Sequence, residues 1–190
     1  NLTGLSQAAV CKKGVARTFQ NIRLFNNMSV IKNVLISLAN HPEYKCNLLQ
    51  SIFRTNRYYE TEKAMRAEAK EILDVFGLLN ERNVLSCSLP YGKQRKLEIA
   101  RAIATRPKLL LLDEPAAGMN PQETEELTRT IALIRERYRV TILLIEHDMK
   151  LVSGVCEEIT VLEFGKTLAQ GDTKEVLSSP EVVKAYLGED

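Results

Sequence analysis

The chain has 190 residues, of which 45% are hydrophobic and 26% charged, so it can bury a core of its own and suits one or two small domains. Its net charge of +2 argues against a strongly basic nucleic-acid-binding surface, and no apolar run approaches the roughly 18 residues needed to span a bilayer. The four cysteines are widely spaced without a C-x-x-C pair, which favours free thiols in a reducing compartment over a metal site.

The first part of the chain has a short strand pattern before Gln20 and helical patterns from residue 26 to 88. The clearest helix is predicted over residues 61–76, where apolar residues recur at helical spacing and Gly77 is a typical stop. Residues 41–59 mix apolar, aromatic and basic side chains without a clear period. We therefore expect them to form a mobile connection within a helical region.

Residues 89–102 are predicted to form a helix that begins near a glycine, Gly92. Backbone N–H groups at a helix start can approach an anion where a glycine leaves room, and the helix N-terminus adds partial positive charge. The side chains of Lys93, Arg95 and Lys96 add full charges nearby, which would suit a phosphate group. The alternative is an ordinary amphipathic helix with a basic start.

Residues 109–112 are four consecutive leucines that run directly into Asp113 and Glu114. Such a run predicts a buried parallel strand, and the carboxyl end of such a strand is where open α/β sheets bind ligands. Two carboxylates there suit nucleotide hydrolysis, in which the first can hold Mg²⁺ and the second can orient or deprotonate the attacking water. A core strand followed by an acidic turn is the alternative.

From residue 106 onward the pattern alternates strand, helix, strand, helix, which predicts a parallel α/β layer. The start of the helix between the strands is marked by three residues. Asn120 is the expected N-cap, Pro121 occupies the first helical position, and Glu123 follows three residues after the cap.

A second apolar run, residues 140–145, predicts another buried strand, and it leads into His147, one of two histidines in the chain. A lone histidine at a strand end is often a hydrogen-bonded structural residue. Residues 159–169 then predict a hairpin with its turn at 165–166, and Ser179-Pro180 predicts the start of a last short helix.

Taken in chain order, these segments resemble the motifs of the ATP-binding-cassette (ABC) family. The matching segments are residues 17–25 for the Q-loop, 89–102 for the signature, 109–115 for Walker B, 116–121 for the D-loop and 142–148 for the switch histidine. The resemblance covers nearly the whole chain. It implies an α/β fold, namely a partial P-loop NTPase core with a helical subdomain. Residues 1–25 would be a remnant of the core with the Q-loop, 26–88 the helical subdomain, and 89–190 the signature helix and C-terminal α/β core.

The resemblance also implies roles for individual residues. Asp113 would serve Mg²⁺ and Glu114 would activate water, while Gln20 would reach both the ion and the water. His147 would contact the γ-phosphate. The signature and D-loop would bind the ATP held by an opposite subunit, through Tyr91, Gly92, Lys93, Gln94 and Asn120. This sequence departs from the common family pattern in having Pro90 and Tyr91 where Ser and Gly are usual, and Asn120 where Asp is frequent.

The version of the signature found here, together with residues 185–189, is typical of the ATPase subunits of branched-chain amino-acid importers. This implies ATP and Mg²⁺ as cofactors, and a second ABC ATPase subunit and transmembrane permease subunits as partners, with no nucleic acid. It also implies a peripheral position on the cytoplasmic face of the cell membrane. No stretch matches G-x-x-x-x-G-K-[ST], the loop that cradles phosphates, so the sequence resembles the later part of a cassette and is expected to be inactive alone.

Two other interpretations remain open. A non-transport ABC ATPase of DNA repair would carry very long coiled coils between Q-loop and signature, whereas here Gln20 and the first signature residue, Leu89, are only 69 positions apart (89 minus 20). A translation factor would usually carry two cassettes. A non-catalytic regulatory or interaction fragment would agree with the missing phosphate loop. The presence of Glu114 and His147 speaks against that second interpretation.

Overall fold

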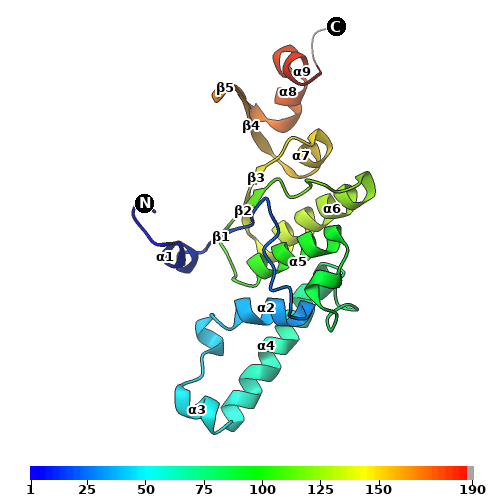
Figure 1. Ribbon diagram of the computed structural model, residues 1–190. Coiled ribbons are helices and arrows are strands. Elements are labelled where there is room, and N and C mark those ends of the chain that lie inside the picture. Colours follow the sequence, from blue (N-terminus) through cyan, green and yellow to red (C-terminus); the bar gives the residue numbers. More distant parts are fainter. Residues whose placement is uncertain (188–190) are drawn as a thin grey trace. The chain divides into compact units, whose positions relative to one another are not determined.

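The computed structural model describes residues 1–187, which form helices and two small β-sheets (Figure 1). The chain divides into two compact units, Asn1–Ile145 and Glu146–Asp190. The three-part division implied by the family resemblance has different boundaries and stays a prediction. Two residues of the importer-type ending predicted at 185–189, Gly188 and Glu189, lie outside the described residues.

A three-stranded parallel sheet lies at the centre of the first unit, in the order β1-β2-β3. Strand β2 (Leu109–Asp113) lies between β1 (Val15–Arg17) and β3 (Thr141–Ile145). Leu110 and Leu112 are almost fully buried because alternate residues of β2 point to one face of the sheet. The parallel α/β arrangement predicted from the sequence is confirmed.

Strand β3 is less buried than predicted. Leu143 and Ile145 are 58% and 59% exposed, although the apolar run predicted a strand covered on both faces. Leu143 pairs with Leu111 and Ile145 with Asp113, so the exposed side chains lie on the face opposite Leu110. Within residues 1–187, β3 is an edge strand, and the sheet face that carries Leu143 and Ile145 is only partly covered. The strand is therefore less buried than its apolar sequence predicts.

The helices of the first unit are α1 (Gln7–Lys12), α2 (Val30–Leu38), η1 (Pro42–Tyr44), α3 (Leu48–Ile52), α4 (Asn56–Val75), η2 (Ser86–Ser88), α5 (Tyr91–Ile103) and α6 (Pro121–Tyr138), where η marks a 3-10 helix. Helices α1 and α5 contact strand β1, and α2, α4 and α5 pack on one another. Val34, Leu73 and Leu97, from α2, α4 and α5, are completely buried where these helices meet. No helix within residues 1–187 has both the length and the apolar character required to cross a membrane.

The segment 41–59, which we expected to be an irregular connection, contains η1, α3 and the start of α4. Arg106, which precedes β2, contacts η1 of this segment. Its guanidinium donates to Glu43 and Glu68 at 2.8 Å each and lies 5.8 Å from the centre of the Tyr44 ring. Tyr44 in turn donates a hydrogen bond to Glu68. These long-range contacts fix η1, which has no helical periodicity of its own.

The pKa values of two residues in this cluster are shifted. Burial raises the pKa of Tyr44 to about 12, and the hydrogen bond to Glu68 acts in the same direction. Burial also opposes ionisation of Glu68, but hydrogen bonds from Arg106 and Tyr44 outweigh it and lower the pKa of Glu68. A carboxyl group with a lowered folded pKa stabilises the fold above its unfolded pKa, and this stabilisation is lost as the pH falls through the folded pKa.

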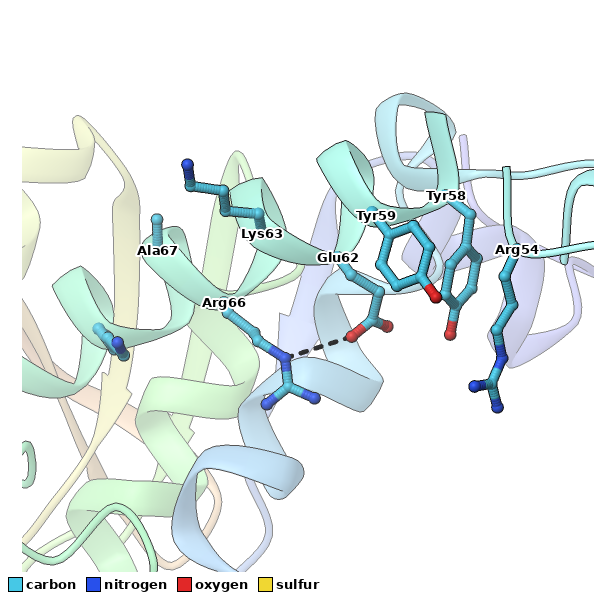
Figure 2. A pocket seen from close by; sticks show the side chains of 8 residues that line it. Arg54, Tyr58, Tyr59, Glu62, Lys63, Arg66 and Ala67 are labelled. Atoms are coloured by element: carbon cyan, nitrogen blue, oxygen red, sulfur yellow. Dashed lines mark hydrogen bonds and ion pairs between the residues drawn. The ribbon is translucent and has the colours of Figure 1, made fainter. Parts of the chain in front are cut away.

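We expect Glu68→Gln to lower the free energy of unfolding at pH 7 and to flatten its decline below about pH 4. Urea unfolding at pH values from about 3 to 7 measures both effects. The control is Glu62→Gln, which breaks an exposed pair at 3.2 Å with Arg66 on the face of α4 drawn in Figure 2. This control should change little, because exposed pairs contribute little to stability. Identical pH profiles for Glu68→Gln and the unchanged chain would contradict the expectation.

The second unit contains an antiparallel hairpin and the helices α7 (Met149–Val155), α8 (Thr173–Leu177) and α9 (Pro180–Leu187). Strand β4 (Glu158–Glu163) pairs with β5 (Lys166–Asp172), as the predicted hairpin requires. Val161, Val176 and Val182 form its small core. Helix α9 begins at Pro180, as predicted.

The hairpin turn is Phe164-Gly165, one residue earlier than predicted, because Glu163 pairs with Lys166. Both turn residues have positive φ angles, 46° and 76°, as a two-residue type I′ turn requires. Phe164 is 98% exposed, and a left-handed backbone is unfavourable for a bulky side chain. The turn therefore contains strain that another residue could relieve.

Phe164→Asn should raise the free energy of unfolding by about 1 kcal/mol, because Asn tolerates positive φ and Asn-Gly suits a type I′ turn. Thermal unfolding of the whole chain measures the change. Leu162→Asn is the matched control: it also removes an exposed apolar side chain, 63% exposed, but in the extended strand β4, where Asn is unfavourable. A melting temperature that rises equally for both variants, or for neither, would refute the assignment of strain to the turn.

Candidate functional site

Glu114 directly follows β2 and has a left-handed backbone, with a φ of 43°. Its N–H group donates to the carbonyl oxygen of Ile145 at 2.9 Å, so the residue remains attached to β3. Left-handed conformations are uncommon for residues other than glycine and are kept only where the surroundings impose them. Such strain is frequent at functional sites, and here it falls on the predicted catalytic carboxylate.

The segment after β1 reaches the same strand end. Thr18 continues the ladder by donating its N–H to Leu111 at 3.0 Å, and the side-chain amide of Gln20 then donates to Glu114 Oε2 at 2.9 Å. Arg17 donates to Asp113 at 2.9 Å. The structure thus brings together the predicted residues Gln20, Asp113 and Glu114, although they are far apart in the sequence.

This strand end has donors that fit Mg²⁺, which prefers oxygen ligands. Asp113 and the side-chain oxygen of Gln20 would hold the ion. The side chain of Asp113 is 24% exposed, and that of its partner Arg17 is 57% exposed and can move away. A carboxylate beside such an ion, as Glu114 is, can orient or deprotonate a water molecule.

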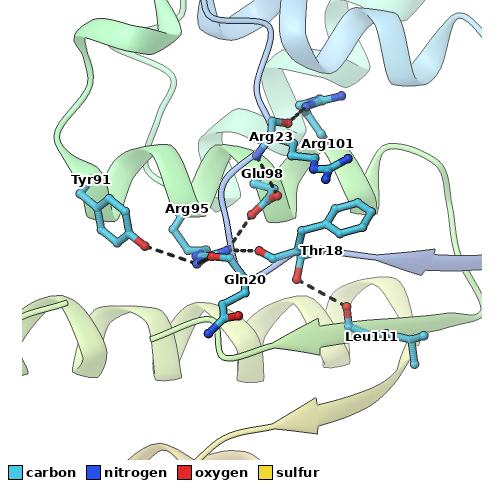
Figure 3. Close-up of polar contacts among 9 residues, drawn as sticks. Thr18, Gln20, Arg23, Tyr91, Arg95, Glu98, Arg101 and Leu111 are labelled. Atoms are coloured by element: carbon cyan, nitrogen blue, oxygen red, sulfur yellow. Dashed lines mark hydrogen bonds and ion pairs between the residues drawn. The ribbon is translucent and has the colours of Figure 1, made fainter. Parts of the chain in front are cut away.

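A buried ion pair, which sequence reasoning did not identify, contacts the backbone of Gln20 (Figure 3). Arg95 on α5 has no exposed surface, and it donates to Glu98 at 2.8 Å and to the carbonyl oxygens of Phe19 and Gln20 at 2.6 and 2.7 Å. The charge of Arg95 is therefore balanced within the chain, and its effect on a phosphate stays a prediction. The signal available in the sequence was the spacing of Arg95 and Glu98, which places opposite charges on one face of a helix.

The start of α5 packs against the start of α6. Asn120 and Glu123 form the predicted capping box, in which Glu123 accepts the N–H of Asn120 at 3.1 Å and Asn120 accepts that of Glu123 at 3.0 Å. A Cβ atom on Gly92 would lie 2.6 Å from Glu123 Oε1, and one on Gly118 would lie 3.5 Å from the ring of Tyr91. The structure therefore brings Tyr91, Gly92 and Asn120 together, and a side chain at position 92 would displace the end of the Glu123 side chain.

The polar side chains of the next turn have partners within the chain. Lys93 pairs with Glu81, and this hydrogen bond lowers the pKa of Glu81. Gln94 donates to the carbonyl oxygen of Leu89 at 2.8 Å. Lys96 pairs with Glu126 at 2.9 Å. The contacts of Lys93 and Gln94 with a nucleotide stay predictions, and the basic charge near the helix start is balanced by nearby carboxylates.

His147 belongs to the second unit, between β3 and α7. The side chain of His147 is 72% exposed. Its backbone N–H donates at 3.0 Å to the buried carboxylate of Glu146. Asp148 caps α7 by accepting the N–H groups of Lys150 and Leu151 at 2.9 and 3.1 Å. These bonds fix the backbone at His147, and its role beside Glu114 stays a prediction.

Comparisons with known proteins identify the family of this chain. The family model for "ABC transporter" matches residues 3–117, and the model for "Branched-chain amino acid ATP-binding cassette transporter" matches residues 166–190. The chain is 44% identical over 189 residues to the high-affinity branched-chain amino acid transport ATP-binding protein LivG of Escherichia coli, which covers 100% of this chain and 73% of LivG. It is 44% identical to the corresponding protein BraF of Pseudomonas aeruginosa, covering 99% of this chain and 73% of BraF. The methionine import ATP-binding protein MetN of Staphylococcus haemolyticus is 30% identical, covering 100% of this chain and 52% of MetN.

Solved structures show the same fold. The ADP conformation of MJ1267, an ATP-binding cassette of an ABC transporter, superposes with a TM-score of 0.73 at 29% identity, covering 99% of this chain and 74% of MJ1267. At 24% identity, cbiO1 of Clostridium perfringens matches the fold with a TM-score of 0.75, covering 95% of this chain and 66% of cbiO1. The family model covers more than half of the chain and LivG matches its full length, so this chain belongs to the ATP-binding-cassette family.

Proposed function

We propose that this chain carries the ATP-hydrolysing, energy-coupling machinery of an importer for branched-chain amino acids, with ATP and Mg²⁺ as cofactors. The observation that carries the proposal is the hydrogen bond between Gln20 and Glu114, 2.9 Å long, at the end of β2 beside Asp113. The identity of 44% to LivG and BraF supports branched-chain amino acids as the imported solutes.

In the proposed mechanism, Asp113 would hold Mg²⁺, which when bound would neutralise charge on the phosphate groups. Glu114 orients the attacking water and accepts its proton, and Gln20 keeps this carboxylate in place through its side-chain amide. His147 would contact the γ-phosphate. The left-handed backbone of Glu114, fixed by the bond to Ile145, sets the direction of the carboxylate.

A second ABC ATPase subunit would complete each site. The start of α5 would bind the ATP of the opposite subunit, mainly near Tyr91 and Gly92, because a helix N-terminus attracts phosphate. Lys93 and Gln94 would contribute after exchange of their present partners, Glu81 and Leu89. Asn120 would act from the D-loop side.

An exposed apolar patch next to the Q-loop suits the docking of transmembrane permease subunits at the cytoplasmic face of the membrane. It consists of four side chains between 37% and 47% exposed: Phe25, Met28, Val84 and Leu85. A bridge between Ser29 and Leu85 joins its two segments, and Arg101 lies 4.7 Å from the centre of the Phe25 ring. Exposed apolar patches are typical of interaction sites, and this one continues directly into the segment that carries Gln20.

Solute uptake tests the proposal. In a protein in which this sequence follows a phosphate-binding loop, reconstituted in vesicles with its permease subunits, ATP should drive uptake of labelled leucine. Labelled methionine is the alternative solute to test, because the related protein MetN is named for methionine import. Uptake of methionine without leucine, isoleucine or valine would overturn the solute assignment. Uptake of leucine that needs no ATP hydrolysis would overturn the energy-coupling role.

A further inference from the structure

A charged pair is buried where α5 meets the segment that carries Gln20. Arg95 has no exposed surface, Glu98 is 5% exposed, and their side chains are 2.8 Å apart. Burial of two charges is costly, and well-packed apolar residues of similar volume often give equal or higher stability. Stability alone therefore does not account for this pair, and its hydrogen bonds indicate another role.

The pair binds the backbone on both sides of the Gln20 side chain. Arg95 donates to the carbonyl oxygens of Phe19 and Gln20, and Glu98 accepts the N–H of Arg23 at 3.2 Å (Figure 3). Residues 19–23 belong to no helix or strand, so these bonds satisfy backbone groups that secondary structure would otherwise pair. The position of Gln20, and with it the 2.9 Å contact to Glu114, depends on α5.

The same helix begins at the signature segment. Arg95 lies one turn after Tyr91 and also approaches the Tyr91 hydroxyl at 3.4 Å, while Gly92 packs against the capping box of α6. A helix is rigid over one turn, so a displacement of its start moves Arg95 as well. The start of α5 and the backbone of Gln20 are therefore mechanically connected through one side chain.

We propose that Arg95 and Glu98 are positioning residues that join the signature helix to Gln20, so that contact of an ATP-bearing subunit with the start of α5 sets the distance between Gln20 and Glu114. The inference rests on the function proposed above. Neither residue touches nucleotide, and both act through Gln20.

A double-mutant cycle on ATP hydrolysis tests this coupling, again in a protein in which this sequence follows a phosphate-binding loop. Arg95→Met, which fills a similar volume without charge, should lower kcat about tenfold or more and leave the KM for ATP within about twofold, because small misplacements of catalytic groups are costly. In a Gln20→Ala background the same change should cost less than about twofold, since its route of action is already removed.

Two further variants strengthen the test. Glu98→Gln keeps the shape of the side chain and should reproduce the pattern of Arg95→Met in both backgrounds, so a failure of Arg95→Met to fold leaves the test intact. Arg66→Met is the matched control, because it breaks an Arg–Glu pair on an exposed helix face, and it should leave hydrolysis unchanged. Amide hydrogen exchange should become faster at Arg23 in Glu98→Gln, because the N–H of Arg23 donates to Glu98. This measurement reports on the contact independently of ATP.

The outcomes separate the inference from the proposed function. If the fold losses in kcat from Arg95→Met and Gln20→Ala multiply in the double variant, Arg95 acts independently of Gln20. That result overturns the inference alone. A Gln20→Ala variant with unchanged hydrolysis overturns the role given to Gln20 and the inference with it. A smaller loss from Arg95→Met in the Gln20→Ala background supports both.

Discussion

Replacement of Glu114 by Gln is expected to lower ATP hydrolysis at least about a hundredfold, the contribution typical of a positioned general base. The protein required is one in which this sequence follows a phosphate-binding loop. The structure makes the substitution informative, because the new amide still offers an oxygen to the Gln20 side chain, which now donates to Glu114 at 2.9 Å. Geometry is kept while the basic group is removed. Nucleotide binding should persist, and the ATP-bound dimer should accumulate.

Steady-state phosphate release and light scattering with ATP measure the two halves of this expectation. Glu125→Gln is the control, since Glu125 is an exposed residue of α6 paired with Arg129, and it should hydrolyse ATP normally. Near-normal turnover in Glu114→Gln would falsify the assignment of Glu114 as the base.

The second large effect is expected at the start of α5. Gly92→Asp should abolish ATP-driven dimerisation and leave the affinity of the single subunit for nucleotide nearly unchanged. A carboxylate there repels the phosphate of the opposite subunit, and its Cβ atom would lie 2.6 Å from Glu123 Oε1. Dimerisation can be followed by light scattering in the Glu114→Gln background, where the dimer persists.

Gly92→Ala separates the two causes. It shares the Cβ atom with Gly92→Asp but adds no charge, and the end of the Glu123 side chain can move aside by giving up the capping box. Its cost should be near that of a lost helix cap, about 1 kcal/mol, with dimerisation retained. If Gly92→Asp instead destroyed nucleotide binding by the single subunit and left dimerisation intact, the cross-subunit role of the signature would be wrong.

Those elements with strong local signals could be predicted from the sequence. The four leucines specified β2, and Asn120, Pro121 and Glu123 specified the start of α6, because strands and capped helix starts depend on residues close in sequence. The family motifs then indicated that Gln20, Asp113 and Glu114 lie together. The structure places them so because β1 runs parallel to β2.

Features that depend on distant residues could not be predicted in this way. The bonds of Arg95 to Phe19 and Gln20 span about 75 residues of sequence, and Arg106 gives structure to η1 from a similar distance. The burial of β3 depends on what covers its outer face, and an apolar run alone does not contain that information. The hairpin turn shifted by one residue because strand pairing, rather than the glycine alone, determines which two residues turn.

The left-handed backbone of Glu114 has a consequence for any engineering of this chain. Folding by itself favours Gly or Asn at such a φ angle, so the residue best for the fold and the residue proposed for chemistry differ at position 114. In a protein in which this sequence follows a phosphate-binding loop, a library selected for heat resistance alone would replace Glu114 by the residue that the fold favours and would lose hydrolysis without any sign of misfolding. Screens on this scaffold therefore need a turnover assay at every round.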